Sequence, residues 1–243
     1  MKMLVFARRN MKEILRDPLN LAFGLGFPVV LLLLLSAIQA NIPVSLFEID
    51  SLAPGIAVFG LSFITLFSAT LISRDRGSAL LQRLYTAPLA SRDFILGYTL
   101  PLLPLALAQT GVCLMVALAL GLEFSWHLLA AILFSLPAAL FYIALGLLCG
   151  SIFTDKQVGG ICGALLTNLS AWLSGIWFDL SLVGGAFEKI AHLLPFVHGV
   201  EMGRAVLRGN YAGIFPHMYW VMGYAVLVLL MAVGAFLRQM KRK

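Results

Sequence analysis

The stretch RDRGSALLQRLYTAPLASRDF, residues 74–94, is a charged segment in a chain that is otherwise strongly apolar, and this contrast decides the fold class. Its charged side chains are Arg74, Asp75, Arg76, Arg83, Arg92 and Asp93. Gly77-Ser78 can begin a helix and Ala87-Pro88 can end one, and the leucines between them form one apolar face with Tyr85. The pattern predicts a short amphipathic helix at residues 78–87, in a loop between two long apolar segments.

The composition of the whole chain is that of a membrane protein. Of its 243 residues, 61% are hydrophobic and only 12% are charged, and the mean hydropathy is +0.97. Soluble domains are about 45–50% apolar and about 25% charged. The apolar surplus therefore indicates that lipid is the solvent and that the chain forms one membrane domain. The basic balance is typical of cytoplasmic loops, so no nucleic-acid partner is expected.

Long apolar segments predict how often the chain crosses the membrane. A membrane-spanning helix needs about 20 mostly apolar residues. Six stretches qualify, at about residues 19–40, 52–73, 94–121, 127–153, 158–178 and 214–237. We therefore expect an all-α membrane protein with a six-span transmembrane domain over residues 19–243. Prolines within the spans predict kinks inside a helix bundle: Pro28, Pro101, Pro104 and Pro137.

The distribution of basic residues predicts the orientation of these spans. If the N-terminus is cytoplasmic, only Lys189, Arg204 and Arg208 of the 17 basic residues fall outside. Cytoplasmic loops carry the excess of Lys and Arg. We therefore expect a multi-pass protein of the cell (inner) membrane, with both termini and the loop at residues 74–93 in the cytoplasm.

Two segments outside the spans are also predicted to be helical. Residues 3–17, within a cytoplasmic segment 1–18, form an amphipathic pattern typical of a helix in the headgroup region, which ends before Pro18. Its expected apolar face consists of Leu4, Ala7, Met11, Ile14 and Leu15. The outer segment 183–209 is predicted to be a re-entrant hairpin of two short helices split at Pro195.

Motifs for catalysis and metal binding are missing from the sequence. No lysine follows a glycine, which excludes a Walker A phosphate loop, and neither HExxH nor GxSxG occurs. Cys113, Cys149 and Cys162 lie inside apolar runs, so we expect packing residues and no metal site. No span carries an ionisable residue near its centre, which disfavours an ion-coupled carrier. That carrier and a non-transporting membrane scaffold remain the alternatives to the function considered next.

Three motifs resemble one family. Arg74-Asp75-Arg76-Gly77, then Leu80, Leu81, Arg83 and Leu84, then Pro88-Leu89, resembles the loop after the second span in type-2 membrane subunits (permeases) of ATP-binding-cassette (ABC) exporters. Arg9-Asn10 and Arg16-Asp17-Pro18 resemble the family's amphipathic N-terminal helix, and Leu194-Pro195 with Arg204 and Gly209 its outer segment. Gln82 departs from the charged residue that the family often has there.

The resemblance implies a half-transporter without an active site of its own. Two copies pair as a homodimer or heterodimer, and each docks on a separate cytoplasmic ATPase, which binds the ATP and Mg²⁺. Residues 78–87 become the coupling helix, whose apolar side chains fill a groove of the ATPase while the arginines face acidic residues. The implied coupling residues are Arg74, Asp75, Arg76, Gly77, Leu81, Arg83, Leu84, Tyr85 and Pro88. A basic loop lying on the lipid surface is the alternative.

Small polar residues on two spans suggest a cargo path. Ser62, Thr65 and Ala69 recur at i, i+3 and i+7 on the second span, and Thr167, Ser170 and Ser174 do so on the fifth. With the family's cavity between these spans, the expected path residues are Phe63, Thr65, Thr167, Asn168 and Trp172. Such a cavity suits export of a hydrophobic or amphipathic cargo, drug-like, peptide or lipid-like, as in multidrug efflux. Plain helix packing is the competing explanation, and the GxxxG spacings at Gly146–Gly150 and Gly159–Gly163 also predict close helix contacts.

Overall fold

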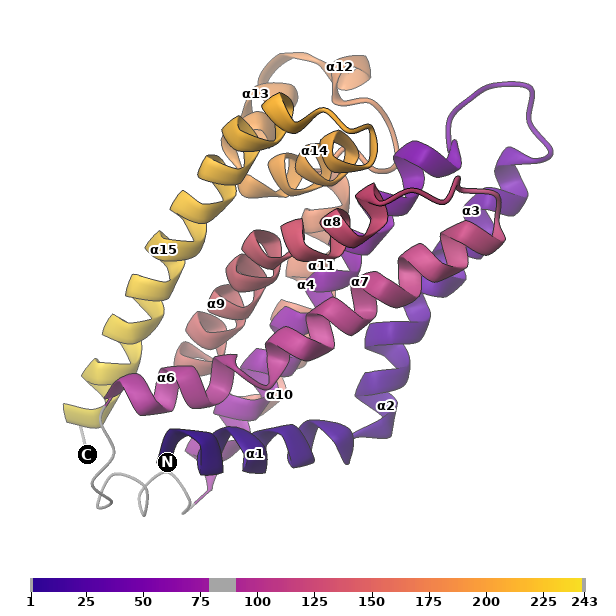
Figure 1. Cartoon of the computed structure of the whole chain (residues 1–243). Coiled ribbons are helices and arrows are strands. Elements are labelled where there is room, and N and C mark those ends of the chain that lie inside the picture. The colour runs from indigo at the N-terminus through magenta and orange to yellow at the C-terminus, as the bar shows by residue number, and fades with distance from the viewer. Residues whose placement is uncertain (1, 79–90, 242–243) are drawn as a thin grey trace.

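The computed structural model of the chain describes residues 2–78 and 91–241, and every regular element within these residues is a helix. The helices form an elongated bundle (Figure 1). Both termini lie at the same end, which we call the basal end, together with α1 (Lys2–Leu15), α10 (Asp155–Val158) and the last turn of α4 (Ile49–Gly77). The opposite, distal end carries α12 (Leu180–Val183) and α13 (Gly185–Leu193).

Helix α4 is the centre of the bundle. It has 29 residues, and its side chains are buried almost without interruption from Leu52 to Ser73. At 1.5 Å per residue it is roughly 43 Å long, enough to cross a bilayer. It packs against α3 (Phe27–Gln39), α7 (Leu102–Ala119), α9 (Leu136–Ile152) and α14 (Pro195–Leu207). Helix α15 (Tyr211–Lys241) lies along α9.

Five helical segments among the described residues are long and apolar enough to span a membrane. They are Pro18–Gln39, Ile49–Gly77, Asp93–Ala119, His127–Ile152 and Tyr211–Arg238. Several are built from shorter pieces: α2 (Pro18–Leu21), the π-helical segment η1 (Ala22–Gly26) and α3 (Phe27–Gln39); α6 (Ser91–Thr99) and α7 (Leu102–Ala119); α8 (His127–Phe134) and α9. They overlap five of the six predicted spans. The chain is thus an all-α membrane protein.

The predicted fifth span, residues 158–178, is a shorter helix than expected. α10, the π-helical segment η2 (Gly159–Leu166) and α11 (Thr167–Trp172) form one continuous run. The run ends at Leu173, and Gly175 then takes a positive φ of 68° in the turn that follows. The run begins in charged residues, so its apolar part falls short of about 20 residues. The six-span count therefore stays a prediction.

The helix breaks within spans coincide with prolines. The third span bends between Thr99 and Leu102, next to Pro101, and the fourth bends at Ser135, two residues before Pro137. Proline lacks an N–H group and its ring collides with the preceding turn, so it favours a break in a helix. It does not always cause one: Pro54, Pro104 and Pro216 lie inside α4, α7 and α15, which continue as α-helices. The predicted kinks at these two places are confirmed.

Close contact between α4 and α9 depends on glycines and hydroxyls. A Cβ atom on Gly146 would lie 2.5 Å from the main-chain oxygen of Thr65, and one on Gly150 would lie 2.6 Å from that of Ala69. Thr65 Oγ1 donates to Tyr142 O at 2.9 Å across the same contact. The predicted close contact at Gly146–Gly150 is confirmed. Gly159, in contrast, has no neighbour within 4 Å of an added Cβ atom.

The outer segment contains two helices that meet at a break. α13 ends at Leu193, and α14 (Pro195–Leu207) begins directly after Leu194. The carbonyl of Leu193, freed by this break, accepts hydrogen bonds from Trp220 Nε1 at 3.1 Å and from Tyr224 Oη at 2.9 Å. Both donors belong to α15, which therefore holds the break in place. Re-entry of this pair into a membrane stays a prediction.

Candidate coupling site

The last turn of α4, Arg74–Gly77, carries the part of the predicted coupling segment that the structure describes. Residues 79–90 lie outside the described residues, and with them Leu81, Arg83, Leu84, Tyr85 and Pro88. Their coupling roles stay predictions. The site can nevertheless be built from the elements that hold the start of this loop.

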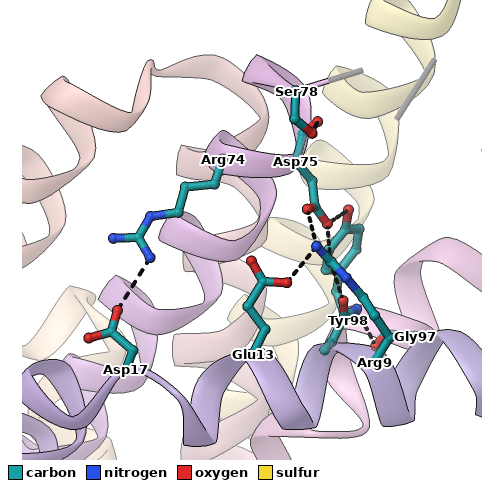
Figure 2. A network of polar contacts seen from close by, with 9 residues as sticks. Arg9, Glu13, Asp17, Arg74, Asp75, Ser78, Gly97 and Tyr98 are labelled. Atoms are coloured by element: carbon teal, nitrogen blue, oxygen red, sulfur yellow. Dashed lines mark hydrogen bonds and ion pairs between the residues drawn. The ribbon is translucent and has the colours of Figure 1, made fainter. Parts of the chain in front are cut away.

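A buried carboxylate lies at the centre of the site. Asp75 is 2% exposed. Its two oxygens accept hydrogen bonds from Nη1 and Nη2 of Arg9 at 2.7 and 2.9 Å, and Tyr98 Oη donates to the same carboxylate at 2.9 Å. Figure 2 shows the guanidinium reaching up from α1 to the carboxylate, with Glu13 on its other side. The ion pair therefore joins α1, α4 and α6.

The two partners of this ion pair are unequally buried. The Arg9 side chain is 37% exposed, whereas that of Asp75 is 3% exposed. Burial alone would lower the pKa of Arg9, but the hydrogen bonds and negative charge of Asp75, with Glu13, outweigh it and raise that pKa. Arg9 thus stays charged, and a bidentate contact of this kind also fixes orientation.

Helix α1 packs on α6 through an unusually close contact. A Cβ atom on Gly97 would lie 2.3 Å from Cδ1 of Phe6, so only glycine fits there. Asn10, which is fully buried, donates from Nδ2 to Gly97 O at 3.0 Å. The ring of Phe6 meets that of Tyr98 edge to face at 5.0 Å. These three contacts therefore fix the position of α1 on α6 and orient Arg9.

The predicted apolar face of α1 is divided between the protein and its surroundings. Ala7 and Ile14 are buried, whereas Leu4 and Leu15 are 60% and 61% exposed in the chain, so contact of this face with the headgroup region stays a prediction. The buried face is rotated toward Phe6 and Asn10, because these two contact α6. An apolar side chain on an amphipathic helix does not by itself indicate which side faces the protein and which faces lipid.

The other charges of this turn also contact the chain itself. Arg74 lies 3.3 Å from Asp17, which precedes α2, and 3.6 Å from Asp155 of α10. Figure 2 shows the contact with Asp17. Arg76 Nη1 donates to the carbonyls of Gly150 and Phe153 at 2.6 and 3.1 Å, at the C-terminal end of α9.

Asp17 adds a further contact at the basal end, where the first span begins. Its carboxylate accepts from Asn20 N at 3.2 Å and from Asn20 Nδ2 at 2.8 Å, which caps α2. Arg16, the remaining predicted residue of the N-terminal helix, is exposed. The last turn of α4 is thus tied by polar side chains to α1, α6, α9, α10 and the residue before α2. A displacement of the last turn of α4 would therefore strain its contacts with all of these elements.

The predicted cargo-path residues occupy different surroundings. Phe63 packs against Phe27 and Phe59 on the α3 side of α4. Thr65 is 1% exposed and bonded to α9. In this conformation of the single chain, these two neighbours in sequence face different helices.

The three predicted path residues of the fifth segment also separate. Thr167 is buried, and its Oγ1 donates to Cys162 O at 2.9 Å inside the widened π turn. Asn168 is exposed, and Trp172 is 55% exposed and lies near the ring of Phe178. The exposed pair lies on the side of α11 away from the bundle, so the structure does not bring all five path residues together. Their role in transport stays a prediction.

Sequence reasoning did not single out several residues of the site. Tyr98 and Gly97 sit in an apolar run, and Asp155 lies at the start of α10. A single tyrosine near a membrane boundary is typical of an interfacial anchor, so the local sequence does not predict its contact with Asp75. The charge of Arg9 was visible, but its partner lies 66 residues away.

Comparison with known proteins gives two findings. A model of the family described as ABC-2 type transporter matches residues 1–207, which run from α1 to the end of α14. The chain is also similar to nodulation protein J of Sinorhizobium fredii (strain NBRC 101917 / NGR234). The two are 24% identical over 231 residues, which cover 93% of this chain and 85% of that protein.

Proposed function

The chain belongs to the ABC-2 type transporter family, and from this premise we propose that it is the membrane-spanning half of an ATP-driven exporter. A separate cytoplasmic ATPase would dock on residues 78–87 and hydrolyse ATP with Mg²⁺, and two permease copies would pair in the membrane. The cargo would be a hydrophobic or amphipathic molecule that leaves the cytoplasm or the inner leaflet.

One observation carries the proposal. Helix α4 runs without a break from the distal end into the predicted coupling loop, and it is the most deeply buried of the spans. Its last turn is fastened to α1 by Arg9 and Asp75, and to α9 by Arg76. Work applied to the loop would therefore reach the membrane bundle through a stiff helix rather than a flexible linker.

The nature of the cargo is inferred from the charges of the spans. The middles of the five described spans carry no Asp, Glu, Lys or Arg. An ionic cargo would need such groups, because a charge within the membrane must be paired or solvated. Polar but uncharged groups on α11, such as Asn168, can hydrogen-bond an amphipathic molecule. The pairing of two copies rests on the family, because exposed leucines such as Leu165 and Leu169 are equally expected on a surface that faces lipid.

The docking proposal is tested by co-purification of the chain with an ATPase that lacks membrane spans and is encoded beside it. Leu84→Glu combined with Pro88→Ala should abolish the association, because a charge enters the apolar groove and the helix loses its stop. Gln82→Ala, a change in the same segment without new charge, is the matched control. Equal recovery of the ATPase with all three forms would refute docking on residues 78–87.

The cargo path is tested in proteoliposomes that contain the same complex. Thr65→Val, which keeps the shape of the side chain, Asn168→Asp and Trp172→Arg should each lower ATP-dependent transport of a fluorescent amphiphile at least several-fold while the ATPase stays bound. Unchanged transport by all three folded variants would withdraw the path. Transport that persists without ATP and stops when an ion gradient is collapsed would instead favour the ion-coupled carrier.

A further inference from the structure

Arg204 of α14 joins three separate parts of the distal end. Its side chain is 15% exposed. Nε donates to Ser51 O in the first turn of α4 at 3.2 Å, and Nη2 donates to Gly175 O in the turn after α11 at 3.1 Å. Nη1 donates to Glu201 Oε1 at 2.7 Å. Its three donor nitrogens therefore each hold a different acceptor.

Close packing brings α14 near enough for this contact. Gly199 and Gly203, one turn apart, face α4: added Cβ atoms would lie 3.1 Å from Cγ1 of Val58 and 3.1 Å from Cβ of Pro54. Small residues at this spacing let two helices approach closely. The next residue after Gly203 is Arg204, which thus reaches over the first turn of α4.

That first turn lacks one hydrogen bond of the α4 helix. Pro54 has no N–H, so the carbonyl of Asp50 lacks its usual partner within the helix. The turn also stands between two cavities of about 410 and 370 Å³, and Ser51 lines both. Only the second cavity is lined by Arg204. A shift of this turn would therefore change the shape of both cavities.

The two ends of α4 are held by analogous contacts. At the basal end Asp75 binds Arg9, and at the distal end the carbonyl of Ser51 binds Arg204. Ser51 and Asp75 are roughly 36 Å apart along α4. If α4 tilts as one body, movement at its basal end strains the distal contact.

We infer that Arg204 is a positioning residue of the transporter. It holds the distal end of α4 against α14 and the turn after α11, and movement of the coupling loop breaks these hydrogen bonds so that the distal end opens. The opening step rests on the proposed function, whereas the anchor does not. Lysine cannot replace arginine here, because its single nitrogen cannot reach three acceptors that the planar guanidinium contacts through three separate nitrogens.

The anchor is tested by hydrogen–deuterium exchange on the full chain in lipid nanodiscs. In Arg204→Gln, amides at residues 48–56 and 173–177 should exchange about tenfold faster, the factor expected when a charge-assisted hydrogen bond is lost. Arg204→Lys should behave in the same way. Glu201→Gln should stay near wild type, because both carbonyl contacts remain, and Arg208→Gln is the control at an exposed arginine one turn further.

The outcomes separate the anchor from a simple charge pair. If Arg204→Lys exchanges like wild type, or if Arg204→Gln changes nothing in these peptides, the anchor is overturned. In the complex with the ATPase, adding ATP and Mg²⁺ should speed exchange at residues 48–56 in wild type and add little in Arg204→Gln. An unchanged wild type in a complex that hydrolyses ATP overturns the opening step. Failure of the ATPase to bind is seen beforehand in the co-purification and counts against the proposed function alone.

Discussion

Replacing Arg9 by glutamine should destabilise the chain more than replacing Asp75 by asparagine, although both changes break the same ion pair. The reason is the unequal burial of the partners. The Asp75 side chain is 3% exposed, whereas that of Arg9 is 37% exposed and also contacts Glu13. Removing Arg9 leaves a buried carboxylate with Tyr98 as its remaining side-chain donor in Figure 2. Removing the charge of Asp75 leaves an arginine that still reaches Glu13 and water.

The magnitudes follow from this asymmetry. Leaving one partner of a fully buried pair costs about 3–5 kcal/mol, and partial exposure of Arg9 screens this to about 2–3 kcal/mol for Arg9→Gln. Asp75→Asn keeps an oxygen that can accept from Tyr98, so the expected loss is about 1 kcal/mol. For a chain of about this size, one kcal/mol corresponds to about 2–4 °C in the melting temperature.

The assay is thermal unfolding of the full chain in nanodiscs, read as the apparent melting temperature at a fixed heating rate. Arg9→Gln should lower it by about 5–10 °C and Asp75→Asn by about 2–4 °C. The double variant should lie above Arg9→Gln alone, because no unpaired buried charge is left. Tyr98→Phe, which removes one donor and keeps the ring, should fall between wild type and Arg9→Gln.

Two results would refute the reasoning. The first is a larger loss for Asp75→Asn than for Arg9→Gln, which would mean that burial of the carboxylate does not set the energy of the pair. The second is strict additivity in the double variant, which would mean that the two side chains do not interact at all.

Two further predictions concern the bundle and its distal end. Gly146→Leu should abolish the monodisperse folded fraction in size-exclusion chromatography, because its Cβ would lie 2.5 Å from Thr65 O, whereas Gly159→Leu should be tolerated. Lowering the pH from 7.5 to 5 should lower the melting temperature. Burial first, and then the charges of His217 and His192, depress the pKa of His198, whereas the hydrogen bond from its Nε2–H to His192 O at 2.8 Å opposes this shift. The fold therefore favours the neutral ring, and this stabilisation is present above a pH of about 6.5 and lost as pH falls through the folded pKa. His198→Gln should flatten this dependence, and an equal slope in that variant would assign the effect to other groups.

The spans and their breaks could be predicted because they depend on local properties. Length and apolarity select membrane helices, and Pro101 and Pro137 lie beside two of the breaks, whereas Pro104 leaves α7 unbroken. The close contact at Gly146 was also predicted from its GxxxG spacing, but the same spacing at Gly159–Gly163 leaves Gly159 without a neighbour within 4 Å of an added Cβ atom, so the spacing alone does not decide the contact. The fifth segment was predicted too long, because Gly175 ends it through a turn that apolar length does not reveal.

The candidate site was only half predictable. Arg9 and Asp75 stood out as charges beside apolar segments, but each was expected to face another molecule. The structure pairs them with each other, with Tyr98 as a third member. Thr65 was a candidate for contact with cargo for a similar reason, and in the chain it bonds to α9. A polar side chain near lipid needs a partner, and the sequence does not say whether that partner is internal.

The sequence by itself determined that this is an all-α membrane protein with a charged loop after its second span, because the free energy of burying apolar length in lipid is additive along the chain. Only the tertiary structure decided which charges meet. Arg9 reaches Asp75 across 66 residues, and Arg204 reaches Ser51 across 153. Such pairs depend on how helices pack, and packing is set by close contacts such as Phe6 on Gly97 that no local pattern encodes.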